Sequence, residues 1–278
     1  MTAVNPESGA GSEGGPDNSA TAIGRQPSQL GSLDQLDREV PPEPATQESG
    51  QSGQSGQSGL PGGLTGAAIK PRLRGWLHAG MFPAALVSGV LLTALAGTLA
   101  SRLACAVYTL SACLLFGISA LYHRGDWSPP VRAILRRLDH ANIFLIIAGT
   151  YTPLTILLLP DGSRELLLWG IWLAALVGIA FRTLWVGAPR WLYTPCYVGM
   201  GWAAVFYLPE FLHAGGVAVL VCVIVGGLLY SLGGLVYGIK RPNPSPRWFG
   251  FHEVFHSLTL AGFVAHYVGI ALVVSQHT

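Results

Sequence analysis

The stretch "HEVFH" at residues 252–256 holds two histidines four positions apart, with a glutamate directly after the first. On a helix, residues with this spacing share one face, with Cβ atoms about 5–6 Å apart. Both imidazoles could therefore reach one zinc ion at about 2.0–2.1 Å. The same pattern is the zinc signature of metalloproteases, in which the glutamate is the general base. Its place in the chain must decide between a protease, a chance match and another metal chemistry.

A third histidine and two further polar residues have types that fit the same chemistry. His123 follows Ser119 by four residues in "SALYH", which places a hydroxyl one helical turn from an imidazole. Asp139 stands at the start of the apolar run in "LDHANIF", and a carboxylate there could hold a water beside a metal or orient a ligand. Three histidines with an open fourth position form the ligand set of a catalytic zinc site.

The composition is that of a membrane protein. Only 11% of the 278 residues are charged, whereas soluble domains carry about 25%. The net charge of +2 is too small to indicate a nucleic-acid partner. The four cysteines stand singly in apolar runs with no CxxC pair, so we expect small core residues and no disulfide framework.

The chain divides into a polar tail and an apolar domain. Residues 1–69 are rich in Gly, Ser, Pro and Gln and show no apolar periodicity, which predicts a disordered cytoplasmic tail. Residues 70–278 contain successive apolar runs long enough to cross a hydrocarbon core of about 30 Å. The predicted fold is all-α: a polytopic membrane protein with a seven-transmembrane-helix bundle. The predicted spans are 77–99, 103–122, 139–159, 166–186, 193–212, 216–239 and 252–274.

The distribution of basic residues predicts the orientation of the bundle. With these spans, twelve Arg and Lys residues of the domain fall on one side, and only Arg102 and Arg164 fall on the other. Because basic loops stay in the cytoplasm, we expect a cytoplasmic N-terminus and an extracytoplasmic C-terminus in the cell membrane. His123, Asp139 and the "HEVFH" pair then all lie at cytoplasmic ends of their spans. They share one membrane depth, which a single site requires.

Other interpretations of these residues stay open on spacing alone. An HxxxH pair by itself is a weak signal, and histidines or aspartates near the interface can cap helices or extend toward headgroups. His140 points about 100° away from Asp139 and is predicted to be a packing or interface residue. His266 lies about 15 Å along the helix from His256 and cannot join the same metal. His78 and His213 stand at span ends, and their spacing indicates no role.

Taken together, "SALYH", "LDHANIFLIIAGTYTP" and "HEVFH" resemble the haemolysin III branch of the progestin and adipoQ receptor (PAQR) superfamily, as does "RGWLHAGMFP" at the opening of the first span. The resemblance covers about residues 70–278. It implies a seven-helix bundle, zinc ligands at His123, His252 and His256, and contacts from Asp139 and Ser119 to the water beside the metal. It implies no role for Glu253. A zincin would take its third ligand from downstream, so "HEVFH" is not interpreted as a protease signature.

Three functions follow from this pattern. The first is a zinc-dependent hydrolase acting on a membrane lipid, with an amide as the expected bond, Asp139 as general base, Glu253 as a weaker candidate and Ser119 positioning the water. The second is a non-enzymatic membrane sensor or regulator in which structural zinc ties three spans together. The third, a cytolysin, fits less well because the chain is permanently inserted and its spans carry almost no polar stripe. The sequence predicts neither the substrate nor the oligomeric state.

Overall fold

The computed structural model describes residues 71–278 except 186 and 188, and the predicted tail at residues 1–69 lies outside the described residues. The described chain is helical, and its only β-type pairing is an isolated bridge between Ser245 and Phe249. The elements are α1 (Trp76–Leu95), α2 (Leu99–Arg124), α3 (Pro129–Leu158), α4 (Asp161–Leu184), α5 (Arg190–Gly201), the 3₁₀ helix η1 (Trp202–Tyr207), α6 (Leu208–Ile239) and α7 (Phe251–Gln276).

Six stretches of this part of the chain are long and apolar enough to cross a membrane. Their outer faces carry large apolar side chains, such as Trp169 and Leu184, which are 76% and 85% exposed. An apolar surface of this extent would be unfavourable in water, but it matches the hydrocarbon core of a bilayer. The chain is therefore a multi-pass membrane protein, as its composition predicts.

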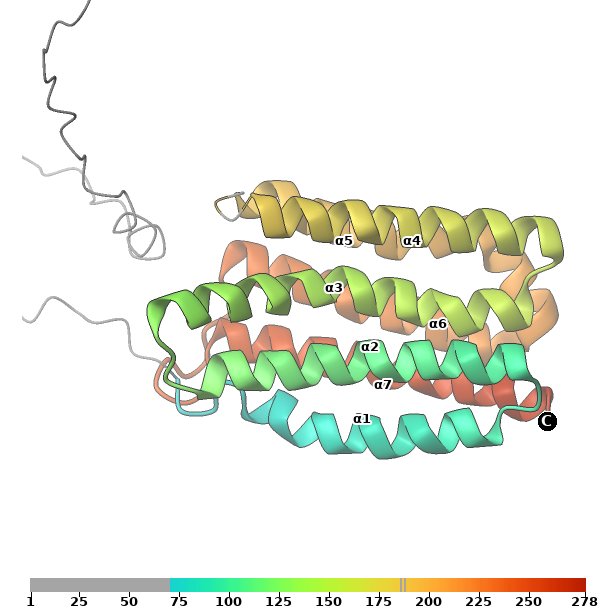
Figure 1. Ribbon diagram of the computed structural model, residues 1–278, viewed down its shortest axis with the longest axis horizontal. Helices are drawn as coiled ribbons and strands as arrows, with labels where there is room; N and C mark the ends of the chain where they lie inside the picture. The colour runs from blue at the N-terminus through green and yellow to red at the C-terminus, as the bar shows by residue number, and fades with distance from the viewer. Residues whose placement is uncertain (1–70, 186, 188) are drawn as a thin grey trace, which may run out of the picture. The chain divides into compact units, whose positions relative to one another are not determined.

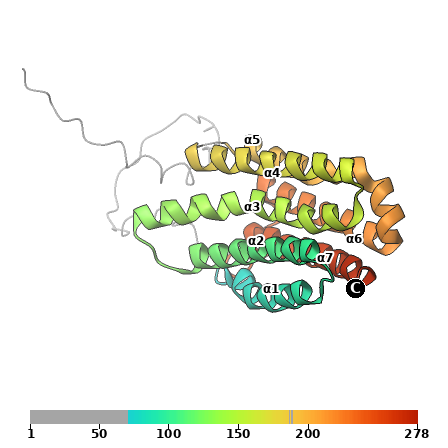
Figure 2. The ribbon, with the colours of Figure 1, turned by 45° about the vertical axis from the view of Figure 1, so that its right-hand side comes forward.

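The helices lie side by side along one direction (Figure 1). Turned by 45°, the bundle shows α1, α2, α3 and α4 in succession, with α7 and α6 behind α2 and α3 (Figure 2). The most extensive packing joins α6 to α7, α2 to α3 and α1 to α2. Helices that are neighbours in the chain are thus mostly neighbours in space, and α7 returns to pack beside α1 and α3.

The fifth apolar stretch runs from Trp191 to Ile239 and contains 49 residues. As one straight helix it would be about 70 Å long, more than twice the hydrocarbon thickness. The chain instead doubles back: the hydroxyls of Tyr193 and Tyr237 lie 3.3 Å apart, and Trp202 Nε1 donates to Ser231 Oγ over 2.9 Å. The helix α5 therefore lies antiparallel to the end of α6.

The predicted fifth span, 193–212, is not one helix. The α-helix ends at Gly201, a 3₁₀ segment follows, and α6 begins with a proline in its first turn. The helix α6 is itself broken at Gly216, whose φ of 77° is non-helical. Pro209 suits a first turn because no intrahelical bond needs its missing N–H.

The helix that contains the third predicted span begins ten residues before that span. The helix α3 begins at Pro129, which follows Ser128 and occupies the first helical position. Asp139 and His140 therefore lie almost three turns inside α3 rather than at its start.

The cysteine prediction fails at one position, because Cys196 is exposed, whereas Cys105 is buried.

Candidate metal centre

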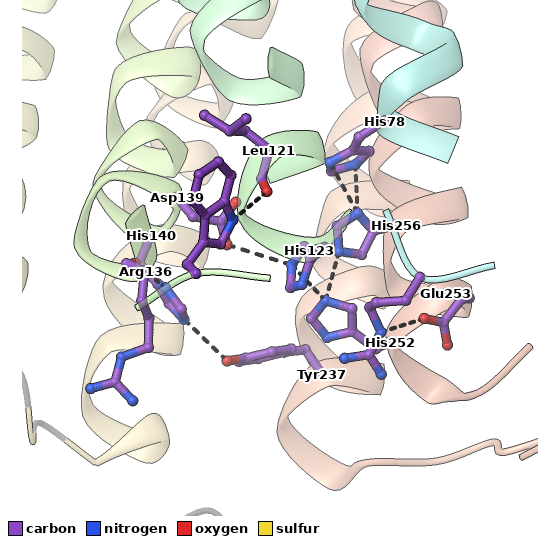
Figure 3. A network of polar contacts seen from close by, with 12 residues as sticks. His78, Leu121, His123, Arg136, Asp139, His140, Tyr237, His252, Glu253 and His256 are labelled. Carbon is purple, nitrogen blue, oxygen red and sulfur yellow. Dashed lines mark hydrogen bonds and ion pairs between the residues drawn. The ribbon is translucent and has the colours of Figure 1, made fainter. Parts of the chain in front are cut away.

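Three histidine side chains converge where α2 ends and α7 begins. His252 Nε2 lies 3.2 Å from His123 Nε2 and 2.8 Å from His256 Nε2. One ligand nitrogen from each ring lies within 4.8 Å of the other two. Figure 3 shows the three rings pointing toward one another. The structure thus brings together the three histidines that were predicted as metal ligands.

These side chains meet because each stands near the end of its helix. The helix α7 begins at Phe251, so His252 and His256 occupy its first two turns on one face. His123 is in the last turn of α2, and the antiparallel course of the bundle places that turn beside the start of α7. His256 is 5% exposed and His123 is 8% exposed, so the protein covers most of the cluster.

The histidine cluster fits a divalent metal ion better than it fits hydrogen bonds alone. A nitrogen of a neutral imidazole is either one donor or one acceptor, yet His252 Nε2 has two ring nitrogens within 3.2 Å. Tetrahedral zinc with bonds of about 2.0–2.1 Å holds its ligand atoms about 3.3 Å apart. The observed separations of 2.8 and 3.2 Å lie near that value. An all-imidazole donor set suits zinc, and also copper, iron and nickel.

Asp139 reaches the cluster from α3. Its Oδ2 lies 3.7 Å from His123 Nε2, and its side chain is 14% exposed. Ser119, one turn before His123, is buried, and its hydroxyl is a hydrogen-bonding neighbour of the Asp139 carboxylate. The two residues predicted to act beside the metal therefore lie at one side of the histidine cluster, in contact with each other.

Glu253 faces the other way. Its Oε1 accepts from Arg74 Nε over 2.6 Å, and its Oε2 accepts from the backbone N–H of Gly250 over 2.8 Å. The side chain therefore caps the first turn of α7 and pairs with the segment before α1 (Figure 3). At 2% exposure it is a buried structural carboxylate, and the geometry does not favour it as a general base.

His78 is the residue that spacing did not single out. It lies on α1, is 2% exposed, and its Nε2 is 2.7 Å from His256 Nδ1. One sequence signal pointed to this region, the resemblance of "RGWLHAGMFP" to the first span of a known family, but it assigned no role to the histidine. Nothing in the spacing from His78 to the other histidines predicts the contact, because α1 and α7 are far apart in the chain.

The remaining histidines of the membrane domain lie outside the cluster. His140 Nδ1 is 2.7 Å from the carbonyl oxygen of Arg136, and its Nε2 is 3.4 Å from the Tyr237 hydroxyl. His266 stacks on Tyr230, with ring centroids 5.5 Å apart. His140 thus occupies a helix interface, and His266 packs away from the cluster, as their spacing predicted.

The fold and the cluster together define a class: a multi-pass helical membrane protein with a histidine centre at one end of its bundle. The family model described as "Haemolysin-III related" matches residues 67–267. The chain belongs to the haemolysin III family of the progestin and adipoQ receptor superfamily.

Similar proteins come from two Bacillus species and from human. "Hemolysin-3" of Bacillus cereus is 35% identical over 169 residues, which cover 60% of this chain and 73% of that protein. "Hemolysin-3 homolog" of Bacillus subtilis (strain 168) is 31% identical over 159 residues, covering 57% of this chain and 71% of that protein. The human "Monocyte to macrophage differentiation factor" is 24% identical over 202 residues, covering 70% of this chain and 80% of that protein.

Proposed function

We propose that this protein is a zinc-dependent hydrolase that cleaves an amide bond of a membrane lipid. The observation that carries the proposal is the convergence of three ring nitrogens from α2 and α7 with a carboxylate 3.7 Å from one of them. Three neutral imidazoles would hold the zinc ion through Nε2 and leave a position for other ligands. When bound, zinc would supply a Lewis acid that polarises the scissile carbonyl.

In this proposal Asp139 transfers the proton and Ser119 orients Asp139. Asp139 Oδ2 accepts a proton from the attacking water as a C–O bond forms at the carbonyl carbon. The same carboxyl group then gives the proton to the leaving nitrogen as the C–N bond breaks, so the products are a carboxylic acid and an amine. Ser119 donates a hydrogen bond to the Asp139 carboxylate and keeps it directed at the water.

The position of the site supports a lipid substrate. The cluster lies at one end of a bundle whose outer surface is apolar, and His252 and Asp139 are only partly covered. A lipid would enter sideways from the bilayer, with its acyl chain in the hydrocarbon region and its amide near the headgroup level. A soluble peptide would have to leave water to reach the same place.

We also propose seven membrane crossings in the cell membrane, with the N-terminus cytoplasmic and the C-terminus outside. The doubling back of the 49-residue stretch supports two crossings there in place of one. The basic residues Arg124, Arg132 and Arg136 lie at the end of the bundle that holds the histidine cluster, which supports a cytoplasmic site. A fluorescent protein fused after Thr278 that folded and fluoresced in the cytoplasm would contradict this orientation.

The variant Asp139→Asn tests the hydrolase. The full chain, purified in mild detergent and placed in lipid discs, is given a panel of N-acyl lipid amides and diacyl phospholipids, and the released fatty acid is measured. We expect zinc content to be unchanged and hydrolysis of the preferred amide to fall by about 10²–10⁴-fold, the usual contribution of a general base. Unaffected hydrolysis would exclude Asp139 as the base. Zinc-loaded wild-type protein that cleaved no lipid would favour the sensor or regulator instead.

A further inference from the structure

We propose that His78 is a positioning residue of the metal centre, which holds His256 in the orientation and tautomer that a ligand needs. This inference rests on the proposed zinc site and assigns a function to α1, a helix that contributes no ligand. Its evidence is the contact between the two rings and the other contacts that join α1 to α7.

The two ring nitrogens of His256 have different neighbours. Its Nε2 lies 2.8 Å from His252 Nε2, inside the cluster. Its Nδ1 lies 2.7 Å from Nε2 and 3.0 Å from Nδ1 of His78. Figure 3 shows His78 on the side of His256 that faces away from His252. His78 therefore contacts the nitrogen of His256 that does not face the cluster.

Metal binding fixes which nitrogen of His256 carries the hydrogen. A ligand nitrogen must present its lone pair, so coordination through Nε2 leaves the hydrogen of the neutral ring on Nδ1. That N–H needs an acceptor, because both rings are buried, at 2% and 5% exposure. An unprotonated ring nitrogen of His78 provides it. The contact takes the place of the carboxylate or carbonyl that usually orients a metal-bound histidine.

The ring of His78 is itself held in place. Phe116 packs edge-on against it, with ring centroids 5.1 Å apart and an interplanar angle of 77°. Arg74, four residues before His78, pairs with Glu253, three residues before His256. Glu253 stands about one helical turn before His256 on α7, and Arg74 lies in the segment that leads into α1, so α7 contacts the start of α1 at two successive levels. The ion pair thus fixes the register at which the two histidines meet.

The experiment compares zinc affinity in the full chain purified in mild detergent. Wild type, His78→Ala, His78→Gln and the control His266→Ala are titrated against a chromophoric zinc chelator. Cobalt(II) loaded in place of zinc gives an absorption spectrum that reports the ligand geometry. The control removes a half-buried histidine that packs on Tyr230 and lies outside the cluster.

We expect His78→Ala to weaken zinc binding by about 10–100-fold, the usual effect of losing such a partner, and to change the cobalt spectrum. His78→Gln should restore much of the affinity, because its amide oxygen can accept the same hydrogen. His266→Ala should match wild type.

Wild-type affinity and an unchanged cobalt spectrum in His78→Ala would overturn the inference, as would equal losses in His78→Ala and His266→Ala. If His78→Ala does not fold, the zinc affinity of His78→Gln decides. An affinity near that of wild type would support the role, and an affinity that stays low would contradict it. If the wild type itself binds no zinc, the proposed function fails together with this inference. If zinc binds through His123 and only the His78 effect is missing, the inference alone fails.

Discussion

Substituting Gly75 tests how tightly the start of α1 is packed against the site. Gly75 precedes the first residue of α1 and has a φ of 81°, in the left-handed region, where a side chain is strained. A Cβ added there would lie 2.9 Å from His123 Cβ and 2.9 Å from Arg124 Cγ. Arg124 can move, since its side chain is long, but the Cβ of His123 is fixed by the backbone of α2.

The expected magnitude follows from these two penalties. A non-glycine residue in the left-handed region costs about 1–2 kcal/mol, and overpacking of a filled site costs about 1–3 kcal/mol. The Gly75→Ala variant should therefore lose about 2–5 kcal/mol of stability. Any relaxation that relieves the contact moves His123 relative to His252, so zinc affinity should fall as well.

The assay is thermal unfolding in mild detergent together with zinc titration. The matched control is Gly80→Ala, in the same helix, where an added Cβ would meet nothing within 4 Å. The control should be as stable as wild type or slightly more so, because alanine favours helix over glycine by about 1 kcal/mol. A Gly75→Ala protein with wild-type stability and zinc affinity would refute the reasoning that α1 closes on the site at this residue.

Two further substitutions test the surroundings of the site. Glu253→Gln should keep its zinc and its lipid hydrolysis but lose about 1–2 kcal/mol of stability, because glutamine has one acceptor oxygen where the carboxylate accepts from both Arg74 and Gly250; lost hydrolysis with zinc retained would show that Glu253 acts in the chemistry. Gly149→Ala should lower the unfolding temperature by adding a methyl group onto the Ser111 hydroxyl between α3 and α2, at a cost of about 1–3 kcal/mol. The control Gly170→Ala, with open space around its Cα, should not change that temperature, and equal effects would contradict the packing argument.

The convergence of the three histidines was predictable because three local signals agreed. Helical spacing put His252 and His256 on one face, hydropathy placed the helices, and the basic residues placed His123 at the same end. The contact of His78 with His256 was not predictable in this way. It depends on which side of α7 the first helix packs, and that is decided by tertiary contacts such as the Arg74–Glu253 pair.

The differences between prediction and structure at α3, α5 and Glu253 have separate physical causes. Hydropathy detects only the part of a helix that suits lipid, so the polar first ten residues of α3, from Pro129, were not included. The 3₁₀ segment after Gly201 and the non-helical Gly216 inside α6 interrupt the fifth span, and apolar composition does not reveal where such breaks fall. Glu253 stands three residues after Gly250, a spacing typical of helix capping, which was a signal for its structural role.

The most direct test of the account is the metal content of the purified protein. Mass spectrometry would measure bound zinc in the wild type, in His123→Ala and in the control His213→Ala, whose histidine is exposed on α6. The account predicts about one zinc ion per chain in the wild type and the control, and a large loss in His123→Ala. A metal-free wild type, or zinc that stays bound without His123, would contradict a centre built from α2 and α7.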